Sequence, residues 1–395
     1  MNLAKKFSDM EALRGFAALG VVVYHFLHGF IPPVYERNGA SVDDFLAVDR
    51  PFLLAFINGP FMVSIFFVLS SFVLTTRLVR EPNRRTALIA MVKRFPRLFP
   101  LTLIGSMLPA FLFAAGLMYN DNLASMIQSP WLERSGGVKV SAGWPEPSIA
   151  GGMVDSLLLF KRGLSQYNSA LWTMKFELIG SLFALATAVM FGARQRIWTD
   201  AAITLVLGTA ALWIHPLISI CVATVFLTKY LSAPDLVLGR RTVGALVISG
   251  LILGSTYKSL PEELLIDPWV RTQVLRVDWL IHGAGAMLLF LGVRGAASRR
   301  LQESSLGRHL GRLSFPMYVL HLPIFASIGS GIIIAAGYSG IAVVLAFFSS
   351  MIVLIAASVP VAKLDEWWVA RLNAFVRRTG ARSERGPVAL ADPAP

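Results

Sequence analysis

The chain has 395 residues, of which 55% are hydrophobic and only 15% are charged, against about 25% charged residues in a typical soluble domain. Repeated apolar runs of about 20 residues therefore predict one integral membrane domain rather than several soluble ones. The formal net charge of +13 could indicate nucleic-acid binding, but the basic residues sit at the ends of apolar runs, as membrane orientation signals do, so we expect no nucleic-acid partner.

Ten apolar runs predict an all-α, polytopic bundle of about ten transmembrane helices in a lipid bilayer. The expected spans are residues 11–30, 57–78, 98–118, 169–192, 199–215, 217–233, 242–257, 277–293, 313–335 and 340–362. Pro216 cannot continue a helix, so it separates the fifth span from the sixth. We assign residues 1–370 to the membrane domain and residues 371–395 to a basic, disordered tail.

Lysine and arginine residues indicate how the spans are oriented. The connecting segments on the side of the N-terminus carry most of the basic residues, whereas the opposite side also carries acidic ones such as Asp43 and Glu262. The positive-inside rule then places both termini in the cytoplasm. We expect a multi-pass protein of the inner cell membrane. The longest outer segment, residues 119–168, contains Trp131 and Trp144, and we expect it to lie on or dip into the outer face.

The first span carries two ionisable side chains, Arg14 and His25, where a lipid-facing helix should have none. Their spacing returns to within about 20° of the same helical face, about 16 Å along the axis. Such residues usually face a protein interior, so the pair indicates a membrane enzyme. A transporter or flippase could also bury charges, but the chain shows no internal repeat of the kind many transporters have.

Four sequence clusters occur in a fixed order along the chain. They lie at residues 11–25, at 66–72 followed by 94–100, at 171–177 and at 313–321. Together they resemble the acyltransferase-3 family, membrane enzymes that acylate carbohydrates and other surface or secreted molecules, over residues 8–365. Three departures from the family pattern are Glu11 in place of aspartate, Ser71 in place of glycine, and Asp365-Glu366 without the proline that usually accompanies this element.

The resemblance implies an acyl-CoA donor, and His25 is the candidate catalytic base or acyl relay. Its imidazole titrates near neutrality and can take a proton from an acceptor hydroxyl as that oxygen attacks a thioester. Arg14 can hold a phosphate, a carbonyl or a buried carboxylate, or it can extend toward the inner membrane surface. We expect no permanently bound cofactor and no metal, because His25 and His28 lack the further ligands of a zinc site.

Arg94 and Arg97 lie at the expected cytoplasmic mouth of the third span. Guanidinium groups bind phosphates with paired hydrogen bonds, so these residues are candidates for holding coenzyme A, with acetyl-CoA as the expected donor. The alternative is an ordinary orientation signal, since membrane proteins carry basic inner loops. The family resemblance favours the binding role.

The cluster at 171–177 supplies two further candidates. A carboxylate inside the bilayer needs a partner, and Glu177 could orient His25, pair with Arg14 or bind sugar hydroxyls. Trp172 could stack on a sugar ring or belong to the aromatic belt at the membrane surface.

The cluster at 313–321 ends on His321, which could orient or replace His25 or bond to the helix backbone. Tyr318 lies one turn earlier, and we include both with the substrate-binding candidates. The sequence thus predicts a membrane O-acyltransferase, with O-acetylation of a cell-surface or exported glycan as the leading interpretation. A small secreted metabolite is the alternative acceptor, and a homo-oligomer is left open.

Overall fold

The computed structural model describes residues 8–32, 55–140, 144–232, 237–256, 268–296 and 305–384. Within these residues every regular element is a helix and no strand occurs, which confirms the predicted all-α class. Seven of the described helices are long and apolar enough to cross a membrane. Each of the ten predicted spans overlaps a described helix, but only seven meet this criterion, because α5, α12 and α13 are shorter, at 17, 15 and 16 residues.

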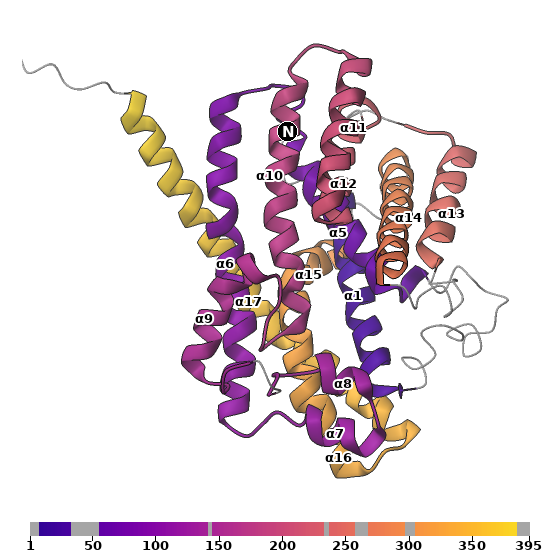
Figure 1. The fold of residues 1–395 in the computed structure, drawn as a ribbon, viewed down its shortest axis with the longest axis vertical. Coiled ribbons are helices and arrows are strands. Elements are labelled where there is room, and N and C mark those ends of the chain that lie inside the picture. Colours follow the sequence, from indigo (N-terminus) through magenta and orange to yellow (C-terminus); the bar gives the residue numbers. More distant parts are fainter. Residues whose placement is uncertain are drawn as a thin grey trace, which may run out of the picture.

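The helices are labelled in chain order in Figure 1. The first half contains α1 (Ser8–Phe30), α5 (Gly59–Thr75), α6 (Arg84–Ala114), α7 (Asn120–Ile127), α8 (Pro130–Ser135), α9 (Ile149–Arg162), the 3-10 turn η2 (Ser169–Trp172) and α10 (Thr173–Phe191). The second half contains α11 (Ile197–Ile214), α12 (Pro216–Tyr230), α13 (Arg240–Ser255), α14 (Pro268–Gly295), α15 (Ser305–Ile324), the π-helical turn η4 (Phe325–Gly329), α16 (Ser330–Ala336) and α17 (Gly340–Glu384).

Helix α17 runs obliquely and extends beyond the rest of the bundle (Figure 1). It continues to Glu384, past residue 370, where we expected the tail to begin. The first part of that expected tail is therefore helical, and residues 385–395 lie outside the described residues.

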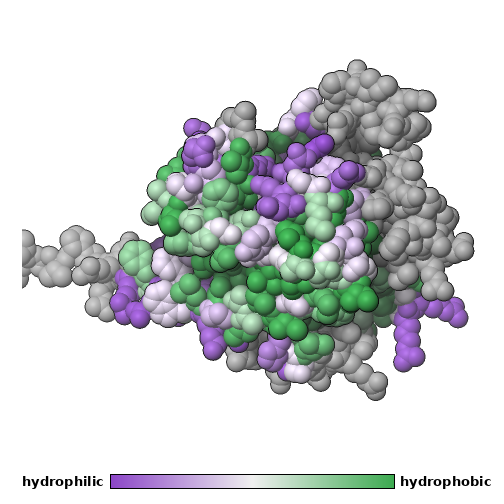
Figure 2. Space-filling model, turned by 90° about the horizontal axis from the view of Figure 1, so that it is seen from below, coloured by the Kyte–Doolittle hydropathy of each residue, from purple (hydrophilic) through white to green (hydrophobic). Residues whose placement is uncertain are grey.

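The outside of the bundle is apolar. Large aliphatic and aromatic side chains of α17, among them Ile341, Phe348 and Ile352, are exposed. Exposed apolar side chains in such numbers are typical of a protein solvated by lipid, which agrees with a multi-pass membrane protein. Figure 2 looks onto one end of the bundle, where hydrophobic and hydrophilic side chains are mixed.

Helices α1 and α15 pack with their backbones nearly in contact. A Cβ atom added at Gly15 would lie 2.6 Å from the carbonyl carbon of Leu310, and one added at Gly311 would lie 2.4 Å from the carbonyl oxygen of Glu11. Only glycine permits this approach, as at other close helix crossings in membranes. The contact brings the polar face of α1 directly against α15.

Residues 119–168 form three short helices rather than a simple loop. Helices α7 and α8 lie at the same end of the bundle as α16 (Figure 1). The Ser129 hydroxyl donates to the carbonyl of Gly29 at 2.8 Å, which fastens α8 to the end of α1. In α9, the buried Asp155 carboxylate accepts a hydrogen bond from Ser165 at 2.6 Å.

Helices α11 and α12 form the tight hairpin that Pro216 predicts. Pro216 begins α12, and Nδ1 of His215 accepts a hydrogen bond from the Leu217 amide at 3.2 Å. At the opposite end of the hairpin, Lys229 and Asp200 form a buried ion pair of 2.6 Å. Both ends of this helix pair are therefore held by specific polar contacts.

Candidate active site

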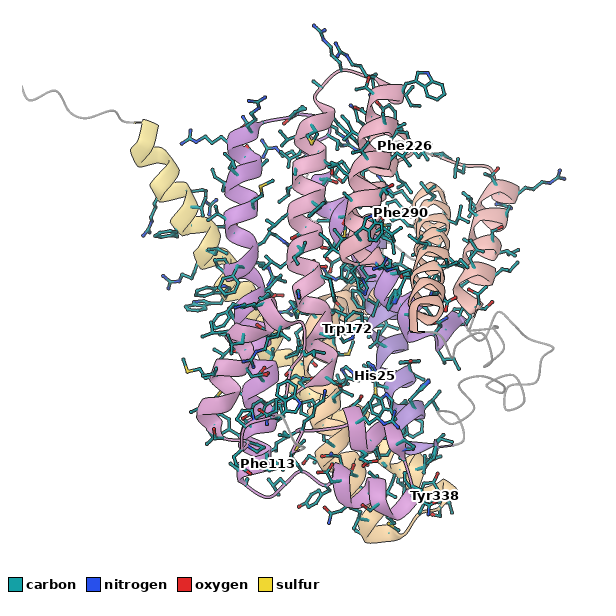
Figure 3. All side chains as sticks on the ribbon, in the orientation of Figure 1. His25, Phe113, Trp172, Phe226, Phe290 and Tyr338 are labelled. Atoms are coloured by element: carbon teal, nitrogen blue, oxygen red, sulfur yellow. The ribbon has the colours of Figure 1, made fainter. Side chains whose placement is uncertain are left out.

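Two predicted site residues, His25 of α1 and His321 of α15, lie in hydrogen-bond contact. Nδ1 of His25 is 2.8 Å from Nε2 of His321, and the two rings are stacked with centroids 4.9 Å apart. Figure 3 shows His25 on α1, close to α8 and α15. The polar face predicted for the first span is thus turned toward the protein interior.

Hydrogen bonds fix the tautomers of both rings. Nδ1 of His321 lies 2.7 Å from the carbonyl oxygen of Tyr318, which can only accept, so this nitrogen carries the proton of the neutral ring. Nε2 of His321 must then accept, and Nδ1 of His25 donates to it. Nε2 of His25 is left with a lone pair and hydrogen-bonds to none of the residues that the structure describes.

The two histidines differ in their exposure. His321 has no exposed surface, whereas the side chain of His25 is partly exposed. The ring of Trp131, from α8, lies 5.5 Å from the His25 ring. We noted Trp131 only as an aromatic residue of the outer segment, because its contact with His25 depends on how that segment folds. His25 can therefore present its free nitrogen to a substrate beside an indole ring.

Tyr318 fastens α15 to the start of α10. Its hydroxyl donates to the carbonyl of Ala170 at 2.6 Å and lies 2.7 Å from the hydroxyl of Thr173. Because a phenol has one proton, Thr173 must be the donor in the second bond. Phe66 of α5 packs against the Tyr318 ring at 6.1 Å. The side chain of Tyr318 therefore holds together three of the four sequence clusters.

Glu177 of α10 and Arg94 of α6 form a buried ion pair. One nitrogen of Arg94 lies 2.6 Å from Oε1 of Glu177, and the two side chains are only 14% and 16% exposed. The Ser70 hydroxyl donates to the same carboxylate oxygen at 2.6 Å. Nε of Arg94 donates to Ser181 at 2.8 Å. Arg94 is thus directed into the bundle rather than toward an open basic mouth.

Arg14 binds α15, so it is not the partner of Glu177. Its Nε donates to the Ser314 hydroxyl at 3.0 Å, and its Nη2 donates to the carbonyl of Gly311 at 2.9 Å. Glu11 lies 3.4 Å away, and the Arg14 side chain is 41% exposed. Arg14 and His25 therefore both contact α15, about three turns apart on α1.

Arg97 pairs with a residue that the sequence interpretation did not assign to the site. Its two terminal nitrogens donate to the two carboxylate oxygens of Asp365 in α17, at 2.5 and 2.9 Å. The side chain of Arg97 is 30% exposed and that of Asp365 is 15% exposed. A carboxylate at the end of an apolar span needs a counter-ion, and this requirement could have pointed to Asp365 in advance.

Trp172 lies in a separate aromatic cluster. Its ring is 5.7 Å from Phe176, 5.8 Å from His215 and 5.9 Å from Trp279. His25 is not among its ring contacts in the part of the chain that the structure describes. This cluster joins α10, the α11–α12 turn and α14.

The fold and these contacts define a polytopic membrane protein with a polar site built on a histidine pair inside an apolar bundle. Residues 7–363 match the family model described as an acyltransferase domain, so the chain belongs to the acyltransferase 3 family. It is therefore a membrane acyltransferase. No curated protein and no solved structure matches the chain.

Proposed function

We propose that the chain is an O-acetyltransferase that moves the acetyl group of cytoplasmic acetyl-CoA to a hydroxyl of a cell-surface or exported glycan. One observation carries the proposal: the hydrogen bonds from Tyr318 through His321 leave Nε2 of His25 with a free lone pair. A general base needs a lone pair, a fixed ring orientation and access to the reacting proton.

In the proposed reaction, His25 is the general base. Its Nε2 takes the proton of the acceptor hydroxyl as the hydroxyl oxygen attacks the thioester carbon. The carbon–sulfur bond then breaks, and the imidazolium returns the proton to the departing thiolate, so the products are an ester and free coenzyme A. His321 acts as a positioning residue, because it holds Nδ1 of His25 and thereby keeps the proton off Nε2.

The donor is proposed to enter from the cytoplasm. The proposed topology has ten spans in the inner membrane and places both termini on the cytoplasmic side. Arg97 and Arg14 are two partly exposed arginines on the side that would face the donor. Planar guanidinium groups suit the phosphates of coenzyme A. Arg94 supports the site indirectly, because its ion pair with Glu177 holds α6 against α10.

The acceptor is proposed to approach His25 from the side of α8. The indole ring of Trp131 lies 5.5 Å from the imidazole and is 9% exposed, so its exposed edge could contact a sugar ring while one hydroxyl points to Nε2. A small secreted metabolite with a hydroxyl group could use the same approach. Trp172, in its own aromatic cluster, would contact only a longer acceptor.

The purified full-length protein in detergent tests the proposal with radiolabelled acetyl-CoA and isolated envelope glycan. We expect acceptor labelling and release of coenzyme A, both lost in His25→Ala. His309→Ala is the matched control, because His309 is an exposed histidine of α15 that bonds to the Ser305 carbonyl, and it should keep activity. Full activity of His25→Ala contradicts the proposal, as does transport of a solute by sealed vesicles without thioester consumption.

Two further measurements refine the assignment. A stoichiometric burst of coenzyme A release without acceptor indicates an acyl-histidine relay on Nε2, whereas its absence indicates direct transfer. Mass spectrometry of surface glycans and secreted metabolites from a strain lacking the chain identifies the acceptor by the acetyl group it loses.

A further inference from the structure

Two consecutive acidic residues of α17 bind two arginines on different helices. Asp365 accepts two hydrogen bonds from Arg97 of α6, at 2.5 and 2.9 Å. Glu366 accepts hydrogen bonds from Nε and Nη2 of Arg312 in α15, the latter at 2.7 Å. Arg14 is also close enough to Asp365 to interact with it electrostatically. Helix α17 thereby bridges α6 and α15 at a cluster of three arginines.

The geometry of these pairs is also that of phosphate recognition. A guanidinium fork receives two oxygens of a carboxylate or two oxygens of a phosphate in the same plane. The pair of Arg312 and Glu366 is 41% and 53% exposed. Exposed ion pairs are weak, so a more highly charged anion can displace the carboxylate. The buried pair of Arg94 and Glu177 offers no such opening.

We propose that Arg97 and Arg312 form the binding site for the phosphates of the acyl-CoA donor, and that Asp365 and Glu366 occupy their guanidinium forks until the donor arrives. This inference rests on the proposed function, which requires such a donor. Donor binding then releases this part of α17 from α6 and α15. The acidic pair acts as a built-in competitor that the donor phosphates must displace.

Beyond these two pairs, α17 is held in this region by polar contacts that can open and re-form. Nε1 of Trp368 donates to the carbonyl of Pro96 at 2.6 Å, and Lys93 donates to the side chain of Asn373. Each contact joins α17 to α6, the helix that carries Arg97. Water can satisfy these groups when the helix moves away, and the donor phosphates take the place of the carboxylates on Arg97 and Arg312, so this part of α17 can detach.

The test breaks each ion pair from both sides and measures binding of coenzyme A to the full-length protein in detergent by calorimetry. If Glu366 competes with the ligand, Glu366→Gln should tighten binding about two- to fivefold, the range expected for an exposed ion pair. Arg312→Gln breaks the same pair but removes a ligand, so it should weaken binding by at least as much. In the same way, Asp365→Asn should tighten coenzyme A binding and Arg97→Gln should weaken it.

Two controls separate this site from general electrostatics. Glu81 and Arg77 form an exposed pair of 3.5 Å before α6, and Glu81→Gln and Arg77→Gln should leave binding unchanged. Pantetheine carries no phosphate, so its binding should not respond to any of the substitutions. The more exposed Arg312–Glu366 pair alone decides the outcome if the Arg97 variants fail to fold.

Changes of the same sign from the two sides of one pair overturn the inference, because they identify a purely structural contact. Absence of coenzyme A binding by the unmodified protein, or an effect of Glu81→Gln equal to that of Glu366→Gln, also overturns it. The readout is binding rather than turnover. If the two substitutions of a pair change coenzyme A affinity in opposite directions but the protein has no transferase activity, the binding site is supported and the proposed function is not. If the two substitutions change the affinity in the same direction but the protein is an active transferase, the proposed function is supported and the binding site is not.

Discussion

Replacing His321 tests whether it sets the proton position on His25. The perturbation is His321→Leu, which preserves side-chain bulk and removes the acceptor of the Nδ1 proton. His321 has no exposed surface, so water cannot replace the lost 2.8 Å hydrogen bond without a rearrangement. His25 itself is then unchanged, but it loses the hydrogen bond that fixes its tautomer.

The size of the effect follows from the bond that is lost. An unpaired donor in a buried site costs about 1–3 kcal/mol, which corresponds to about a five- to 150-fold loss in kcat if it is felt in the transition state. Removing the base itself in His25→Ala should cost more, about 10²- to 10⁴-fold. His321→Gln should fall between the unmodified protein and His321→Leu, because its side-chain oxygen can accept the proton of His25.

The assay is the initial rate of coenzyme A release against acetyl-CoA concentration, at saturating acceptor. The KM for the donor should stay near its original value in both His321 variants, because the arginine cluster lies on another part of the bundle. Equal rates for His321→Leu and His321→Gln would show that the ring only fills space. A kcat of His321→Leu within about twofold of the unmodified protein would remove the tautomer argument altogether.

Three other substitutions probe the surroundings of the site. Gly311→Ala should lower the free energy of unfolding by about 1–3 kcal/mol, because the added Cβ meets the backbone of α1. Gly244 has open space around it, so Gly244→Ala should not lower the stability. Thermal unfolding of both variants in detergent measures the difference. Glu177→Ala should cost about 3–5 kcal/mol by leaving Arg94 charged and unpaired, and retained stability would show that water reaches that arginine. Trp131→Ala should raise the KM for the acceptor and not that for the donor; the opposite split would place the indole on the donor path.

Much of the helical framework could be predicted from the sequence, because hydrophobic run length depends on local composition. The first span and its polar face illustrate this, since helical periodicity alone places Arg14 and His25 on one side. The structure adds that this side meets α15, and glycine at 15 and 311 makes that contact possible. The sequence could not show this contact, because helix pairing depends on the shapes of both partners.

The partners of the charged residues were harder to predict than their presence. Glu177 clearly needed a partner, for which the sequence suggested His25, Arg14 or sugar hydroxyls, whereas the structure pairs it with Arg94. The segment containing Trp131 shows the same limit, because its three short helices bring that ring to His25 through contacts distant in sequence. His321 was a candidate for orienting His25, and the structure places the two rings in contact. A residue pattern indicates the need for a partner, whereas tertiary packing selects it.

The close packing of α1 against α15 at Gly15 and Gly311 has a consequence for the choice of donor. Arg14 and His25 both hydrogen-bond to α15, so the distance between them along α1, about 16 Å, is fixed. A donor whose charged head group binds at the arginine cluster beside Arg14 can deliver its acyl group to His25 only if the arm between the two ends spans about this distance. Short carriers such as acetyl phosphate would fall short of the imidazole however reactive they are.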